Sequence, residues 1–140
     1  MSGVGSRIIA TGAISAALAV AAGAFGAHGL EGRVSSAMLA VWETGARYHF
    51  YHSLGMIVVG LLALHHAAPP GTEVVSARHE VVSRRLRWAA VLMLTGIVLF
   101  SGTLYTMTLS GLLWLGAITP LGGVSFLAAW ALFAWAALDV

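Results

Sequence analysis

The sequence predicts an all-α fold, an integral membrane bundle of four helices that forms a single domain over residues 1–140. The first observation is composition, because 59% of the residues are hydrophobic and only 9% are charged, whereas soluble domains carry about 25% charged residues. The second is a mean hydropathy of +0.91. The third is that Asp, Glu, Lys and Arg are absent from residues 8–30, 48–72 and 88–138. Because a membrane-spanning helix needs about 20 apolar residues, the first two stretches each hold one span and the third holds two. These observations exclude an ordinary soluble protein.

The first span is predicted over residues 8–27. A helical wheel separates a bulky side, which includes Ile14 and Leu18, from a side made of small residues. The small residues are Gly12, Ala16, Ala19, Gly23 and Gly26. Helices in lipid associate where their backbones approach closely, so we expect this small side to be the packing seam. An arginine followed by an apolar run also fits a cleavable signal peptide, and we expect the segment to be retained as a span.

Residues 31–47 are mixed in character and predict a short helix that lies in the membrane interface, with Trp42 on its apolar face. The second span follows over residues 48–67. On it Tyr48, His52 and Gly55 share a small and polar side that we expect to face the bundle. Two prolines after this span, Pro69 and Pro70, are expected to end the helix.

The third and fourth spans are predicted over residues 86–109 and 112–138, with a turn at Ser110 and Gly111. Pro120 lies inside the fourth span and is expected to kink it, since proline pushes away the carbonyl four residues earlier. We expect the following residues at helix contacts: Gly12, Gly23, Gly26, Gly55, Gly102, Gly116, Pro120 and Gly123.

The arginines predict the orientation of the chain. All seven basic residues are arginine, and the formal net charge is +2. Arg7, Arg78, Arg84, Arg85 and Arg87 flank one side of the spans, and Arg33 and Arg47 flank the other. Because cytoplasmic loops carry the excess of positive charge, we expect both termini in the cytoplasm. The arginines lie beside spans, so they indicate topology, and we expect the lipid bilayer and no nucleic acid as a partner.

A few polar residues are predicted to converge in the outer half of the bundle: His28, His49, His52, Tyr105 and Thr119. A buried imidazole is costly without a partner, so we expect Tyr105 or Thr119 to bind His52. One interpretation is that these groups only hydrogen-bond to one another and join the helices. The alternative is a ligand site in the membrane, for a metal, a quinone or a lipid.

A metal site is one form of this alternative, because histidines bind zinc, copper and iron. His49 and His52 are three residues apart, and His28 is expected to approach from the first span. No carboxylate lies within a span and the chain has no cysteine, so nothing completes a tetrahedral set. We therefore predict no cofactor, neither metal nor haem. The same lack of carboxylates disfavours acid–base catalysis, and we do not expect an enzyme.

Four motifs resemble one known family. They are GAFGAHG at residues 23–29, YHFYH at 48–52, SGTLY at 101–105 and GAITPLGG at 116–123. In this order they are similar to the domain-of-unknown-function-423 family of small bacterial inner-membrane proteins, which has relatives that resemble transmembrane protein 256. The resemblance implies a multi-pass protein of the bacterial inner (plasma) membrane with no assigned activity and no catalytic residue.

We therefore predict a structural or accessory component of that membrane, either a homo-oligomer or a subunit of a larger complex. Two alternatives remain open. One is the ligand site described above. The other is a small transporter-like oligomer, because the break at Pro120 resembles the discontinuous helices of transporters.

Overall fold

The computed structural model describes residues 2–66 and 73–139, and it describes side chains over residues 3–66 and 77–139. Within these ranges the chain is helical apart from short turns and contains no strand, which confirms the predicted all-α class. The elements, in order, are α1 (Ser2–Phe25) with a π-helical turn (Gly26–Leu30), α2 (Ser36–His65), α3 (Glu73–Gly96), a π-helical turn (Ile97–Ser101), α4 (Gly102–Ser110), a 3-10 turn (Leu113–Ala117) and α5 (Thr119–Leu138).

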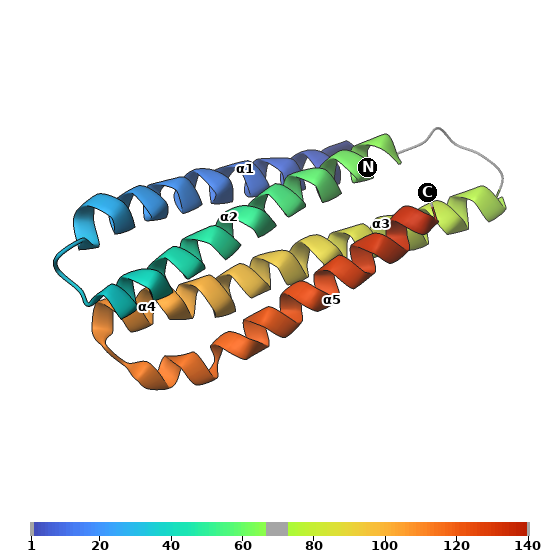
Figure 1. Cartoon of the computed structure of the whole chain (residues 1–140). Coiled ribbons are helices and arrows are strands. Elements are labelled where there is room, and N and C mark those ends of the chain that lie inside the picture. The colour runs from blue at the N-terminus through green and yellow to red at the C-terminus, as the bar shows by residue number, and fades with distance from the viewer. Residues whose placement is uncertain (1, 67–72, 140) are drawn as a thin grey trace.

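The helices run antiparallel, up and down the long axis of the molecule (Figure 1). The start of α1 and the end of α5 lie at one end, and the turn between α4 and α5 lies at the other. α1 packs along α2 and α3 packs along α5, while α2 also contacts α3 and α4. α2 is therefore the helix that joins the two pairs.

In the described part of the chain, three helical stretches are long and apolar enough to cross a membrane, namely Gly3–Leu30, Ala77–Ser110 and Leu113–Leu138. They contain the predicted spans 8–27, 86–109 and 112–138 almost completely. α2, which carries most of the predicted span 48–67, is 30 residues long but does not belong to this group among the described residues. The reason is its polar side chains, since Tyr48, His49 and His52 lower the mean hydropathy of its central part. The prolines predicted to end it, Pro69 and Pro70, lie outside the described residues.

The separate interfacial helix predicted over residues 31–47 does not form. Instead, α2 begins at Ser36 and continues without a break to His65. Ser35 caps this helix, because its hydroxyl accepts a hydrogen bond from the backbone N–H of Met38 at 3.3 Å. Trp42 points inward, where its Nε1 donates to the carbonyl of Ala22 on α1 at 2.7 Å. The tryptophan is therefore a packing residue between two helices and not an interfacial anchor.

Pro120 also differs from its prediction. The 3-10 turn ends at Ala117 and α5 starts at Thr119, so the proline stands in the first turn of α5. At that position a helix has no hydrogen-bond partner for the missing N–H, and the proline costs nothing. The expected kink within one helix is thus a break between two segments.

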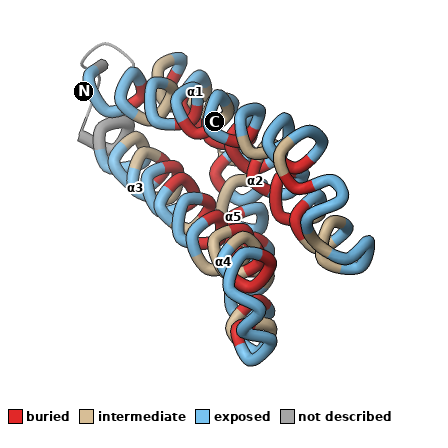
Figure 2. The backbone as a smooth tube through the Cα atoms, turned by 90° about the vertical axis from the view of Figure 1, so that its left-hand side faces the viewer, coloured by how far each residue is buried: buried red, intermediate tan, exposed pale blue. Residues whose placement is uncertain are grey.

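The main core lies where α2, α3 and α5 meet, and it contains Met56, Val59, Leu86, Met93, Ile97, Phe126 and Ala129. A smaller cluster near the turn between α4 and α5 contains Leu104, Met107 and Leu115. Large apolar side chains also cover the outside; Leu127, for example, is 72% exposed and Ile14 is 65% exposed. Buried and exposed positions alternate along every helix (Figure 2). An apolar outer surface of this extent is typical of contact with lipid.

Candidate functional site

A buried chain of hydrogen bonds joins α1, α2 and α4. We call it the His49 network, and its members are Ser15, His49, Ser53 and Tyr105. The hydroxyl of Ser53 donates to Ser15 Oγ at 2.7 Å, and Ser15 Oγ lies 3.0 Å from His49 Nε2. His49 Nδ1 lies 3.2 Å from the hydroxyl of Tyr105. The network therefore connects three helices through one imidazole.

The chemistry of the groups allows two donor orders along the network. If Ser53 donates to Ser15 and Ser15 donates to Nε2, then Nδ1 carries the proton of a neutral His49 ring and donates to Tyr105. Hydroxyls rotate, so the same groups can also donate in the reverse order. Ser53 lies 2.8 Å from the carbonyl of His49 as well and is 0% exposed, so the network ends inside the protein. It joins helices and does not lead across the molecule.

His52 lies one helical turn after His49 but on an adjacent face of α2, from which its ring reaches α5. Its Nδ1 donates to the carbonyl of Tyr48 in the same helix at 2.7 Å. Its ring stacks on Phe126 with 3.4 Å between the ring centroids and 9° between the planes. The prediction that Tyr105 or Thr119 would bind His52 is wrong, because the Tyr105 hydroxyl lies beside His49 and the Thr119 hydroxyl lies beside Thr103.

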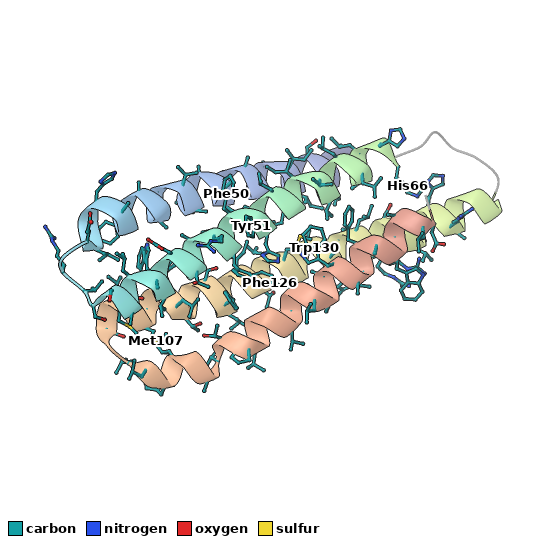
Figure 3. All side chains as sticks on the ribbon, in the orientation of Figure 1. Phe50, Tyr51, His66, Met107, Phe126 and Trp130 are labelled. Atoms are coloured by element: carbon teal, nitrogen blue, oxygen red, sulfur yellow. The ribbon has the colours of Figure 1, made fainter. Side chains whose placement is uncertain are left out.

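A groove of about 510 Å³ opens beside His52 between α2 and α5. We call it the aromatic groove, and it is lined by Tyr48, Tyr51, His52, Phe100, Gly123, Phe126, Leu127 and Trp130. Tyr51, Phe126 and Trp130 lie near the middle of the long axis, far from both ends of the molecule (Figure 3). The groove is therefore at the depth that would lie within a bilayer.

The polar atoms of the aromatic groove are few and can be assigned. Because Nδ1 of His52 carries the proton that binds the Tyr48 carbonyl, Nε2 of the neutral ring is a hydrogen-bond acceptor. Within the described part of the chain, Nε2 and the hydroxyls of Tyr48 and Tyr51 have no protein partner. The residues that line the groove thus carry one acceptor and two hydroxyls among otherwise apolar side chains.

The predicted set of three histidines does not assemble. His28 is exposed in the π-helical turn after α1, while His49 and His52 face different neighbours. No group of three His, Cys, Asp or Glu side chains that could hold a metal ion occurs among the residues whose side chains the structure describes. The reason is the separation of the two rings around α2, which points them at different helices.

Thr119 belongs to neither arrangement. Its Oγ1 lies 2.9 Å from Oγ1 of Thr103, where the break before α5 passes the start of α4. Thr103 also donates to the carbonyl of Leu99 in the preceding π-helical turn at 2.7 Å. Thr119 therefore helps to hold the break in place. Of the predicted ligand-site residues, only His52 lines the aromatic groove.

The small residues predicted at helix contacts divide into two groups. A Cβ on Gly12 would lie 2.9 Å from the carbonyl oxygen of Ser53, and one on Gly26 would lie 2.6 Å from the Trp42 ring. Gly55 is also tight, at 3.0 Å from Met93. By contrast, Gly23 and Gly123 have nothing within 4 Å, and Gly102 and Gly116 have only loose neighbours. Within one copy of the chain neither Gly23 nor Gly123 makes the predicted close helix contact, because Gly23 is exposed and Gly123 lines the aromatic groove.

The sequence reasoning missed Ser15 and Ser53 of the His49 network and most of the lining of the aromatic groove, including Phe126. Ser15 follows Gly12 by three residues and Ser53 follows His49 by four, so both lie on the packing faces of their helices. A polar residue on the small face of a span is a signal for a hydrogen bond between helices. Phe126 carries no such signal, because one phenylalanine in an apolar helix resembles any other.

The helical fold, its spans and its apolar exterior define a helical membrane protein. The chain belongs to the family described as a protein of unknown function, DUF423, which it matches over residues 22–123. It is 47% identical over 130 residues to the UPF0382 membrane protein YwdK of Bacillus subtilis, covering 93% of this chain and 94% of the relative. It is also 43% identical over 122 residues to a UPF0382 membrane protein of Staphylococcus epidermidis, covering 87% of both chains. No solved structure matches the chain.

Proposed function

We propose that all four helical stretches cross the bacterial inner membrane, with both ends of the chain in the cytoplasm. The antiparallel arrangement supports this proposal, because α2 lies among helices that are long and apolar enough to span. Two of the three polar side chains that lower the hydropathy of α2, His49 and His52, are buried and hydrogen-bond inside the protein. The excess of arginine at the end that holds the start of α1 and the end of α5 supports the orientation.

We further propose that the protein binds a membrane-soluble ligand with a flat ring, such as a quinone or quinol, in the aromatic groove. The observation that carries this proposal is the unpartnered Nε2 of His52 in a groove of about 510 Å³ walled by aromatic rings. Ligand pockets are typically apolar with a few placed polar groups. A ring hydroxyl would donate to Nε2, and a ring carbonyl would accept from Tyr48 or Tyr51. The stack of His52 on Phe126 keeps the imidazole in one orientation for this contact.

Titration of the purified protein with decylubiquinone in phosphatidylcholine nanodiscs tests the proposal, with quenching of tryptophan fluorescence as the readout. Trp130 lines the groove, so bound quinone is expected to quench it. The key variant is Gly123→Leu. Gly123 lines the groove, and nothing lies within 4 Å of the position that a Cβ would take there, so leucine fills the groove without displacing the neighbouring helices. We expect a folded protein that no longer shows saturable quenching.

A histidine pair supplies the matched control. His52→Ala removes the acceptor and is expected to weaken binding about tenfold, the effect of about 1.4 kcal/mol. His65→Ala removes an exposed histidine that does not line the groove and is expected to leave binding unchanged. Saturable quenching that survives in Gly123→Leu would show that quinone binds elsewhere, and the ligand proposal would then fail.

A second candidate function is that of an accessory component that assembles with itself or with another membrane protein. One observation favours it, since the exposed side of α1 carries small residues at helical spacing: Ala10, Ala13, Ala17, Ala21 and Ala24. Small residues allow a further helix to approach closely in lipid. The chain contains no cysteine, so Ala17→Cys creates a single thiol whose oxidative cross-linking in native membranes tests self-association. Val98→Cys, at an exposed position on another helix, is the control and is expected not to cross-link.

A further inference from the structure

A second groove lies between α1 and α3, at the end of the molecule that holds the start of α1. Its volume is about 300 Å³, and Met56 of α2 is part of its lining. It contains none of the residues that line the aromatic groove. A ligand of this second groove would therefore bind independently of a ligand in the aromatic groove.

Two arginines from different helices line this second groove, Arg7 from α1 and Arg87 from α3. Both are exposed. Among the residues whose side chains the structure describes, the ion pair that forms joins Arg85 to Asp139, and neither groove arginine has an acidic partner. Two positive charges thus share one groove, and none of the described carboxylates pairs with either of them.

The remainder of the groove is apolar. Its wall includes Ile8, Met56, Ala90 and Leu94. Leu94 follows Arg87 by seven residues, which is two helical turns or about 10 Å along the same face of α3. The groove therefore combines a positively charged part with a hydrocarbon-lined part, and these succeed one another along the direction of the helices.

We propose that this second groove binds an anionic phospholipid. The phosphate would lie between Arg7 and Arg87, because the guanidinium fork matches the geometry of a phosphate. An acyl chain would follow the apolar wall towards Leu94. A basic groove between spanning helices, with hydrocarbon walls, suits a lipid better than a soluble anion, which would have no use for the apolar part.

Native mass spectrometry of the detergent-purified full chain tests the proposal, with phosphatidylglycerol, phosphatidylcholine of the same acyl chains and inorganic phosphate as separate probes. We expect phosphatidylglycerol to remain bound where the other two do not. The Arg7→Gln, Arg87→Gln double variant is expected to weaken phosphatidylglycerol binding about thirtyfold, since each arginine near an anionic headgroup contributes about fivefold.

Two further variants make the result specific to the groove. Arg33→Gln with Arg84→Gln removes the same charge from exposed positions that do not line it, and binding is expected to stay the same. Thr11→Phe adds bulk to the groove at an exposed position and leaves every arginine in place, so binding is expected to fall. Equal binding of the two lipids, or an equal loss in the control variant, would overturn the proposal. So would a Thr11→Phe variant that binds phosphatidylglycerol as tightly as the unaltered chain.

Discussion

The substitution Gly12→Ala tests the packing of α1 against α2, and Gly23→Ala on the same helix is its control. An added Cβ at Gly12 would lie 2.9 Å from the carbonyl oxygen of Ser53, whereas ordinary contact begins at 3.4 Å. The obstacle is backbone, which cannot rotate away, so the two helices must separate by about 0.5 Å, the difference of those distances. At Gly23 nothing lies within 4 Å of the same atom.

The difference between the two variants measures the helix contact alone. Alanine favours a helix over glycine by about 1 kcal/mol, and this gain occurs at both positions. Overpacking at Gly12 opposes it by about 1–3 kcal/mol. The separation would also stretch the 3.0 Å contact of Ser15 with His49, one turn further along α1. We therefore expect Gly12→Ala to be less stable than Gly23→Ala by about 1–3 kcal/mol.

Unfolding by sodium dodecyl sulfate in mixed micelles, followed by helical circular dichroism, gives the two free energies of unfolding. We expect the free energy of unfolding of Gly23→Ala to equal or exceed that of the unaltered chain. We expect that of Gly12→Ala to be clearly lower than that of Gly23→Ala. Equal transition midpoints for the two variants would refute the close contact of α1 with α2 at Gly12.

Two further substitutions test other contacts by the same unfolding measurement. Tyr105→Phe removes the hydroxyl that lies 3.2 Å from Nδ1 of His49 and keeps the ring, whose centroid lies 4.5 Å from that of Trp42. We expect the free energy of unfolding to fall by about 1 kcal/mol. An unchanged free energy of unfolding would mean that the hydroxyl contributes nothing to stability. Asp139→Asn breaks the ion pair with Arg85 and leaves the stack of Arg85 on the Trp135 ring, 3.9 Å from its centroid. Because the pair is partly exposed, we expect the free energy of unfolding to fall by at most about 1 kcal/mol. This decrease should shrink as sodium chloride is added, and a decrease that does not depend on salt would contradict an electrostatic origin.

The sequence predicted the helices well where charge marks their limits. Arg7, Arg87 and the charge-free stretches placed the first, third and fourth spans close to their positions in the structure. It failed where the limit depends on a tertiary contact. Trp42 looked like an interfacial anchor, yet its indole donates to a carbonyl on α1, and the helix that carries it runs from Ser36 to His65. Pro120 looked like a kink, yet its missing N–H costs nothing at the start of a helix.

The candidate site was predicted in part. His49, His52 and Tyr105 were expected to hold polar roles inside the bundle, and each does have a polar partner there. The pairing was not foreseen, because residues three apart on a helix lie on adjacent faces and small differences in helix rotation decide which neighbour each one meets. The aromatic groove depends on Phe126 and Trp130, whose place opposite His52 depends on how α5 aligns with α2.

Composition and the distribution of charge determined by themselves that this chain is a helical membrane protein, because free energy of transfer into lipid depends on how many apolar residues follow one another and not on their partners. Only the tertiary structure decided which of two similar glycines touches a neighbour, which histidine joins helices and which one lines a groove. These outcomes depend on the rotation and alignment of each helix, which many contacts set together. The same arrangement brings Arg7 and Arg87, eighty positions apart in the chain, to the two sides of one groove.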